Sequence, residues 1–447
     1  MKAKDYNENL LKLKFEVAKE LNKKYNFVTN FNDNYYNDKE GIFKNTPIYI
    51  KDNLVTKDIK TTAASKFLLD YQSPFDASVV KYLKDEGACI VGKTNMDELA
   101  MGANGKNSVF GPCINPFDDT RVVGGSSSGS AVAVALDLAP LAIASDTGDS
   151  IRRPASFTNT IGFKPSYGLV SRFGLIPYAD SLDTIGIIAN NYFDLRNCFR
   201  IISKKDSNDL SQQAIVKKAN QEPYKFIIFK NCYDEVSSYI KSEMDDLIKQ
   251  LKKKEIEVIF KEYDSELLKV IPTVYYLIAN AEASSNLASL QGVTFARNGY
   301  DLDYQDLIKE NRSQNLSSLV KRRLVIGTHS LNQDHYSSSY LKACKVRRML
   351  NNMYQKDLDD NTFILAPTTN KVASYSDQVE DDLMFSDAVS ENHLILANFS
   401  GQPSISIPFS FKNKMPYGLS LTGSLYNDNN LINAAEFLAK IIGDDYE

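Results

Sequence analysis

The chain has 447 residues, of which 43% are hydrophobic and 24% charged, with a formal net charge of −4 and a pI near 5.7. This length supports a large buried core. A mildly acidic chain is not built to bind a polyanion over its whole surface, so any nucleic-acid contact is expected to be local or left to a partner. The five cysteines include no C-x-x-C pair, which is typical of free thiols in a reducing compartment.

Neither the N-terminus nor the interior has a membrane-spanning pattern. Residues 1–21 read as a charged amphipathic helix without the apolar core of a signal peptide. The longest apolar run, at 131–144, is interrupted by Asp137 and Pro140 and is too short to cross a bilayer. We therefore expect a soluble cytoplasmic protein.

Short apolar runs alternate with helical patterns along the chain. The runs predict strands at 48–50, 88–92, 141–145, 226–229, 258–260, 363–367 and 404–408. Helical periodicity predicts helices at 76–86, 236–254, 273–290, 334–357 and 429–442. This alternation favours an α/β fold with a largely internal sheet, in which the more charged stretch 204–262 forms an appended lobe.

Two serine-containing segments flank the long apolar run, GGSSSGS at 124–130 and ASDTGDSIRRP at 144–154. Within the first, GSSSG matches the G-x-S-x-G pattern of α/β-hydrolase nucleophiles, with Ser127 in the middle. That turn requires a strand directly before it, whereas a loop rich in Pro and Asp precedes this one, and none of the three histidines has a setting that suggests catalysis. Spacing alone favours helix-capping serines over a catalyst and leaves both interpretations open.

No metal or nucleotide site is indicated. The histidines form no H-E-x-x-H or cysteine-spaced pattern, and the chain has no G-x-G-x-x-G or Walker A loop.

The block from GGSSSGS to SLDTIG, residues 124–186, closely resembles the amidase signature family. Further segments resemble that family in the same order: TPIYIKDNL (46–54), GKTNMDELAMGANG (92–105), INPFDDTRVVGG (114–125), YYLIANAEASSNL (275–287), VKRRLVIGT (320–328) and ILAPTT (364–369). Within the family, these segments look most like the A subunits of tRNA-dependent amidotransferases. The resemblance covers nearly the whole chain.

The resemblance implies a single amidase-signature domain over residues 1–447, with a central mixed, mostly internal β-sheet covered by helices on both faces. Its catalytic core is expected at about 45–200 and 270–425, with the charged lobe at about 204–262 inside it.

A triad of Ser150, Ser126 and Lys51 follows from the same resemblance. Ser150 would be the nucleophile, and Ser126, preceded by a cis peptide bond, would pass its proton to Lys51. Lysine accepts a proton only when neutral, so its reference pKa of about 10.4 must fall by roughly 3 units. The apolar residues around Lys51 fit the burial that such a shift requires. Ser127 is expected to form a supporting hydrogen bond near the lysine.

The resemblance also implies an oxyanion hole built from backbone N–H groups. These belong to Thr147, Gly148, Asp149 and Ser150. The family normally has glycine at the positions of Ser128 and Asp149, so the Asp149 carboxylate must point away from the developing charge. We expect Arg152 or Arg153 to hold it aside.

For recognition of glutamine, the resemblance points to Arg323 for the α-carboxylate and to Tyr275. The acidic group for the ammonium is either Glu391 or Asp387, and both stay open because this part of the chain departs from the family. No metal or cofactor is implied in this chain.

The implied activity is glutamine hydrolysis that supplies ammonia to a B subunit. With ATP and Mg²⁺, that subunit would convert Glu-tRNA(Gln) or Asp-tRNA(Asn) to the amidated form, and a small C subunit would complete the complex. Two alternatives remain at this point: a free-standing amidase acting on another small amide, and an inactive scaffold subunit, which Asp149 motivates.

Overall fold

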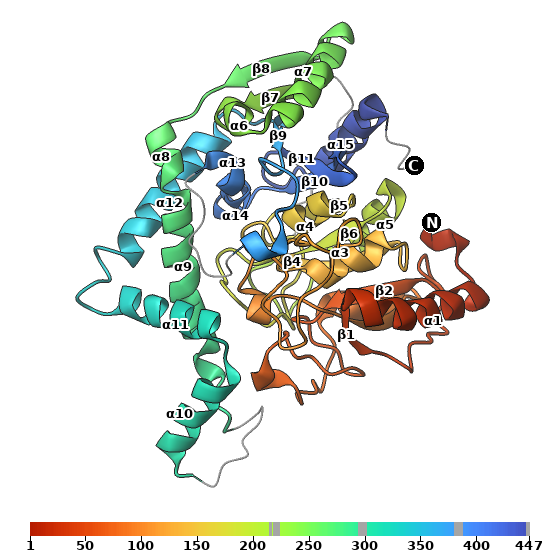
Figure 1. Ribbon diagram of the computed structural model, residues 1–447, viewed down its shortest axis with the longest axis vertical. Helices are drawn as coiled ribbons and strands as arrows, with labels where there is room; N and C mark the ends of the chain where they lie inside the picture. Colours follow the sequence, from red (N-terminus) through yellow and green to blue (C-terminus); the bar gives the residue numbers. More distant parts are fainter. Residues whose placement is uncertain (214–216, 218–223, 294–301, 380–387, 444–447) are drawn as a thin grey trace.

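The computed structural model describes residues 1–213, 217, 224–293, 302–379 and 388–443 (Figure 1). Its strands form one mixed sheet of eleven strands in the order β1-β3-β2-β4-β6-β5-β10-β11-β9-β7-β8. The strands are β1 (Val28–Phe31), β2 (Pro47–Lys51), β3 (Cys89–Thr94), β4 (Leu141–Asp146), β5 (Ile161–Lys164), β6 (Thr184–Ala189), β7 (Lys225–Phe229), β8 (Glu257–Lys261), β9 (Thr362–Pro367), β10 (Ser404–Lys412) and β11 (Met415–Thr422). All seven strands predicted from apolar runs are present.

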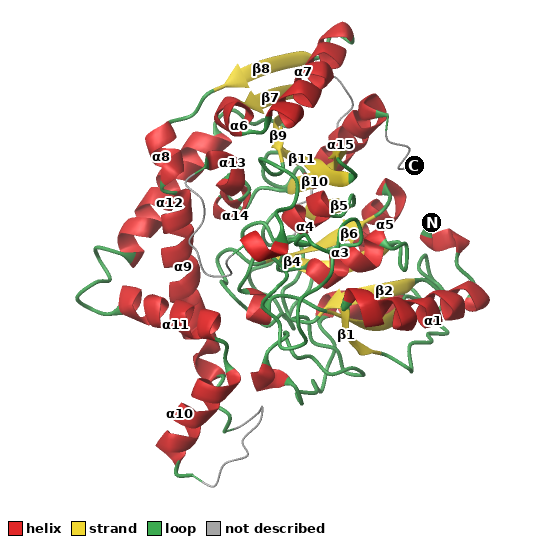
Figure 2. Ribbon diagram, in the orientation of Figure 1, coloured by secondary structure: helices red, strands yellow, loops and turns green. Residues whose placement is uncertain are grey.

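Helices cover both faces of the sheet (Figure 2). They are α1 (Glu8–Tyr25), α2 (Ser78–Asp85), α3 (Ser128–Ala135), α4 (Arg152–Phe157), α5 (Tyr192–Ile202), α6 (Lys230–Glu235), α7 (Ser238–Lys253), α8 (Ser265–Lys269), α9 (Ile271–Asn286), α10 (Tyr304–Asn315), α11 (Ser318–Leu331), α12 (Tyr340–Gln355), α13 (Val389–Asn392), α14 (Ile395–Phe399) and α15 (Asp428–Ile442).

Alternate residues of one strand pack into different apolar clusters, which is why the strands read as continuous apolar runs. Ile48 and Ile50 of β2 belong to a cluster that also contains residues of α2, α5, α7 and α15, whereas Tyr49 between them belongs to a cluster with residues of α1 and α3. Further along the sheet, Ile364 of β9 belongs to a third cluster, which contains residues of α9, α11 and α12. A sheet buried on both faces gives no polar alternation, so the expected α/β architecture with an internal sheet is confirmed.

One predicted helix begins later than expected. The pattern at 334–357 forms a helix only from Tyr340, because the preceding serine-rich stretch makes turns. Ser339 Oγ lies 2.7 Å from the carbonyl oxygen of His335 and 3.1 Å from that of Ser330. Such local hydrogen bonds compete with helix formation.

The charged stretch 204–262 contributes β7 and β8 at one edge of the same sheet, at the top of Figure 1. β7 pairs in parallel with β9, so the hydrogen-bonded ladder runs into this stretch without a break. Within the described residues, no helix is both long and apolar enough to span a bilayer.

The topology brings the motif segments together at one end of two neighbouring strands. β2 and β4 are parallel partners, with Ile50 opposite Ile143, so both end on the same side of the sheet. Lys51 is the last residue of β2, and the turn that contains Ser150 directly follows β4. Carboxyl ends of adjacent parallel strands are a common place for a binding site.

The helices α9 and α11, which lie beside the sheet at the left of Figure 1, pack at a glycine. A Cβ at Gly327 of α11 would lie 1.9 Å from the carbonyl oxygen of Asn280 in α9. Only glycine permits this approach. The distance between α11 and α9 therefore depends on Gly327.

We predict that Gly327→Ala lowers the free energy of unfolding by roughly 1–3 kcal/mol, because the added methyl group forces the two helices apart. Chemical denaturation measures this. The control is Val325→Ala on the same helix, since Val325 is 68% exposed and its truncation should change stability by less than about 0.5 kcal/mol. Equal stability of the two variants would contradict the close helix contact.

Candidate active site

The side chain of Lys51 is fully buried and reaches three oxygen atoms. Its Nζ lies 2.8 Å from Ser126 Oγ, 3.0 Å from Ser145 Oγ and 3.1 Å from the carbonyl oxygen of Ser145. Burial lowers the pKa of Lys51 from its usual value to about 7, although nearby carboxylates such as Asp146 and Asp97 act in the opposite direction. A substantial fraction of this amine is therefore neutral at neutral pH and can accept a proton.

Ser126 is preceded by a cis peptide bond from Gly125 and lies in a loop held by Asp97. The backbone N–H of Asp97 donates to the carbonyl oxygen of Ser126 at 3.3 Å, and its carboxylate accepts from the N–H of Gly105 at 3.1 Å. A Cβ at Gly125 would lie 2.0 Å from Asp97 Oδ2, so this position needs glycine. The family resemblance indicated the cis bond; the contacts of Asp97 could not be inferred from sequence.

Ser127 connects this loop to the second serine segment. Its N–H donates to the carbonyl oxygen of Ser150 at 3.1 Å, and its hydroxyl donates to the carbonyl oxygen of Ser145 at 3.1 Å. The latter oxygen also accepts from Lys51. Ser127 thus lies where a supporting hydrogen bond near the lysine was expected.

The turn after β4 is fixed by two buried carboxylates. Asp146 pairs with Arg152, whose Nη2 and Nε lie 3.0 and 3.1 Å from its oxygens, and Nη2 also donates to the carbonyl oxygen of Gly148 at 2.8 Å. Asp183 accepts from Thr147 Oγ1 at 2.7 Å and from the backbone N–H of Tyr178 at 2.8 Å. Burial raises the pKa of Asp183 to about 6, so this carboxylate is largely ionised above neutral pH.

Asp149 points toward Arg153, as one of the two expected arrangements requires. Arg153 Nε bonds Asp149 Oδ2 in an ion pair with both side chains mostly buried. Arg152 is occupied instead with Asp146. The carboxylate that replaces the family glycine is therefore neutralised by Arg153 of α4, and the backbone N–H of Asp149 is retained.

Two of the residues predicted to bind substrate lie close to this turn or to its hydrogen-bond partners. A Cβ at Gly148 would come within 3.1 Å of the ring of Tyr275, so the tyrosine lies directly on the turn. Arg323 Nη1 donates to the hydroxyl of Tyr178 at 2.9 Å. Arg323 Nε is buried and has no hydrogen-bond partner among the residues that the structure describes, which leaves a donor available for a ligand.

The acidic residue for the substrate ammonium stays undecided between the two predicted positions. Glu391 lies in α13, and its carbonyl oxygen accepts from Arg153 Nη2 at 2.9 Å, which places its backbone near the turn that contains Ser150. Asp387 lies outside the described residues.

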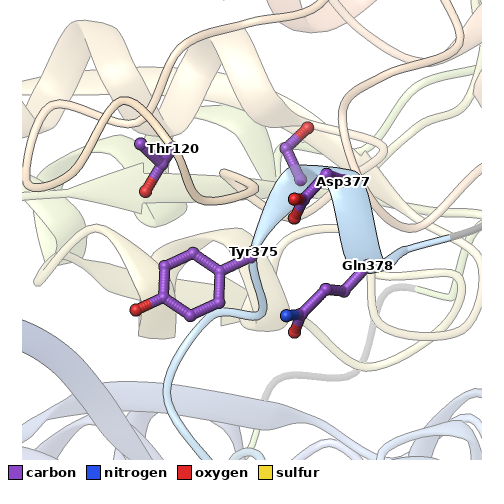
Figure 3. Close-up of a pocket in the computed structure, with 5 residues that line it drawn as sticks. Thr120, Tyr375, Asp377 and Gln378 are labelled. Atoms are coloured by element: carbon purple, nitrogen blue, oxygen red, sulfur yellow. The ribbon is translucent and has the colours of Figure 1, made fainter.

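A pocket of about 710 Å³ involves none of the predicted site residues. Figure 3 shows the residues that line it. Thr120, Tyr375, Ser376, Asp377 and Gln378 line it. Within the part of the chain that the structure describes, no three His, Cys, Asp or Glu side chains are grouped as a metal site would require.

Sequence reasoning missed three residues that support this site: Ser145, Asp183 and Asn398. Asn398 accepts from Arg152 Nη2 at 2.7 Å and donates to Asp146 Oδ1 at 3.0 Å. Each contacts at least one residue that is distant in the sequence, and no spacing pattern marks these contacts.

A buried lysine of lowered pKa lies against Ser126, and the loop of Ser126 is hydrogen-bonded through Ser127 to the turn that contains Ser150. This arrangement suggests the class of serine-dependent amidases. A comparison with protein families agrees: the profile described as Amidase matches residues 11–432. The chain therefore belongs to the amidase family.

Within this family, several similar proteins are A subunits of one enzyme, glutamyl-tRNA(Gln) amidotransferase. The chain is 36% identical to the A subunit of Mycoplasma genitalium, over 94% of this chain and 92% of that protein. It is 38% identical to the A subunit of Sulfolobus acidocaldarius, over 90% and 86% of the two chains. The crystal structure of the A subunit from Thermotoga maritima has a TM-score of 0.80 at 34% identity, covering 95% and 89%. A peptide amidase from Stenotrophomonas maltophilia, 22% identical with a TM-score of 0.77, shares the fold.

We predict that Asp149→Ala lowers the free energy of unfolding by roughly 1–3 kcal/mol, because it leaves the mostly buried Arg153 guanidinium without its anion. Thermal or chemical denaturation measures this. In the double variant Asp149→Ala/Arg153→Ala no charge is left unpaired, so we expect part of the stability to return. A single variant as stable as the wild type would show that the ion pair contributes nothing.

Proposed function

We propose that this chain is the glutamine-hydrolysing subunit of a tRNA-dependent amidotransferase. The observation that carries the proposal is the buried amine of Lys51 at 2.8 Å from Ser126 Oγ. The chain also aligns over most of its length with the A subunits of glutamyl-tRNA(Gln) amidotransferases. Membership of the amidase family supports the hydrolytic step.

In the proposed acylation, Ser150 Oγ attacks the side-chain carbonyl carbon of glutamine. The Ser150 proton passes to Ser126 as Ser126 gives its own proton to Lys51, so the amine becomes an ammonium. The electron pair of the carbonyl moves onto its oxygen, where the backbone N–H groups of Thr147, Gly148, Asp149 and Ser150 would stabilise it.

In the second half of the proposed reaction, the proton held by Lys51 is transferred to the leaving group. The ammonium of Lys51 protonates the departing nitrogen through Ser126, ammonia leaves, and an ester between Ser150 and glutamate remains. Water then attacks this ester with the same proton route in use, and glutamate is released.

Arg323 is proposed to bind the α-carboxylate of glutamine through its buried Nε, for which the described part of the chain offers no acceptor. Tyr275 is proposed to contact the substrate beside Gly148. Glu391, adjacent to the nucleophile turn through Arg153, is the better-placed candidate for the ammonium among the described residues.

The names of the relatives also suggest the setting. We propose that the chain works in the cytoplasm with B and C subunits, and that ammonia is used by the B subunit to amidate Glu-tRNA(Gln) or Asp-tRNA(Asn). ATP and Mg²⁺ would bind that partner, which also contacts most of the tRNA, and this chain itself would need no cofactor. The acidic charge of this chain supports leaving the tRNA to a partner.

The proposal predicts that the chain, assembled with its B and C subunits, releases ammonia from glutamine. Because only neutral Lys51 accepts a proton, kcat/KM should rise as the pH increases through about 7. Lys51→Met should lower kcat about 10³-fold or more, as in other enzymes that lose a triad member. Brisk cleavage of other small amides without glutamine hydrolysis would instead indicate a free-standing amidase.

The same substitution has a stability signature. The pKa of Lys51 is lower in the folded than in the unfolded state, so between about 7 and 10.5 the unfolded chain binds more protons and stability rises with pH. Lys51→Met should remove this part of the pH dependence of unfolding.

Arg323→Ala is expected to raise the KM for glutamine about 100-fold with a smaller change in kcat, because it removes a charged partner of the substrate carboxylate. Steady-state kinetics measures this. Arg322→Ala is the matched control, since Arg322 is exposed on the same helix. A KM shared by both variants would exclude Arg323 from the binding site.

A further inference from the structure

Two of the three oxygen atoms around Lys51 Nζ belong to one residue, Ser145, at the end of β4. Its hydroxyl lies 3.0 Å and its carbonyl oxygen 3.1 Å from the nitrogen. The third neighbour is the hydroxyl of Ser126 at 2.8 Å. Ser145 is 2% exposed, so water does not readily replace it.

This arrangement suits both protonation states of the amine. A neutral amine has two N–H groups and one lone pair, whereas an ammonium has three N–H groups and no lone pair. Suppose that the two oxygens of Ser145 each accept an N–H of Lys51 in both states. Then only the group of Nζ that faces Ser126 differs: a lone pair in the amine and an N–H in the ammonium. Lys51 can then take up a proton without rotating, and no N–H of the ammonium is left unsatisfied.

Separate donors hold the two oxygens of Ser145 in place. Asn53 Nδ2 donates to Ser145 Oγ at 3.0 Å, and Ser127 Oγ donates to its carbonyl oxygen at 3.1 Å. Asn53 is 2% exposed and follows Lys51 by two residues. The hydroxyl of Ser145 is thereby fixed between the amide of Asn53 and the amine of Lys51.

Four carboxylates favour the ammonium form of Lys51 through their charge, but none of them is among the hydrogen-bond partners of Nζ in the described residues. They are Asp146, Asp97, Asp183 and Asp149. Asp146 and Asp149 are paired with Arg152 and Arg153, which reduces their influence. The three atoms that contact Nζ directly are all uncharged, so hydrogen bonding has to stabilise the charge locally.

We infer that Ser145, fixed by Asn53, is the positioning residue that directs the lone pair of Lys51 to Ser126 and stabilises the ammonium formed in catalysis. This inference rests on the proposed function, because it assumes that Lys51 is the base. It assigns to Ser145 a part in the reaction that does not include contact with the substrate.

Ser145→Ala tests it in the full chain with its partner subunits, with glutamine as substrate. Loss of one acceptor for the ammonium should lower the pH at which kcat/KM rises by about one unit, and should lower the pH-independent kcat about 10- to 100-fold. The KM for glutamine should stay within about threefold of the wild type. A purely structural defect would lower activity without lowering the pH at which kcat/KM rises, a pH called here the pH limb.

Two further variants sharpen the result. Ser145→Thr keeps the hydroxyl and should restore the pH limb, whereas Asn53→Ala should shift it partway. Ser130→Ala is the control: it removes another fully buried hydroxyl, which bonds Thr94 rather than Lys51, and should leave the limb in place. Folding of each variant is checked by thermal denaturation.

The outcomes separate the inference from the function on which it rests. A wild-type complex that does not hydrolyse glutamine, or a fully active Lys51→Met, refutes the proposed function. With an active wild type, a folded Ser145→Ala whose pH limb is unchanged overturns the inference, as does a folded Ser145→Thr that behaves like the alanine variant. Should both Ser145 variants fail to fold, an unshifted limb in folded Asn53→Ala overturns it.

Discussion

The site depends on a single amine that the protein keeps out of water. Burial of Lys51 disfavours its charged form, and this is the physical basis for a neutral lysine near pH 7. The packing of β2 between β3 and β4 offsets the free energy that burial of Lys51 costs, since Lys51 is the last residue of β2. A lysine at an exposed strand end would stay protonated and could not accept the proton of a serine.

Burial alone does not make a lysine a base, as two others in the same fold demonstrate. Lys93, on the neighbouring strand β3, lies 3.5 Å from the carboxylate of Asp52 and 2.8 Å from Thr61 Oγ1. Lys164 donates to the carbonyl oxygens of Pro165 and Gln402. Burial lowers the pKa of both, to about 8 for Lys93 and about 7 for Lys164. Lys51 differs because its neighbour is Ser126, whose loop is hydrogen-bonded to Ser150 through Ser127. Connection to the proposed nucleophile, rather than the pKa, distinguishes Lys51 as the proposed base.

The sequence was most informative where chemistry is confined to short segments. Lys51, Ser126 and Ser150 could be proposed as a triad because each lies in a recognisable motif, and apolar runs of three to five residues marked strands such as β2, β4 and β9. The remainder depends on contacts between distant segments. Asp183 reaches Thr147 across 36 residues and Ser145 reaches Lys51 across 94, and no local pattern encodes such a contact. The departure at Asp149 was visible in sequence, but only the structure decides between its two candidate arginine partners.

The residues of the proposed substrate site and those of the turn are joined by one continuous set of hydrogen bonds. Thr147 in the turn bonds Asp183, Asp183 accepts from the backbone of Tyr178, and the hydroxyl of Tyr178 accepts from Arg323. Arg323 belongs to α11, which packs closely on α9 at Gly327, whereas Thr147 directly follows β4. The position of Arg323 relative to the turn is therefore set by buried polar contacts and not by a surface loop. A ligand bound to Arg323 would keep that position. Buried hydrogen-bonded groups are costly to separate. This connection therefore keeps the proposed carboxylate site and the proposed oxyanion donors in a fixed relation, which the proposed attack by Ser150 requires.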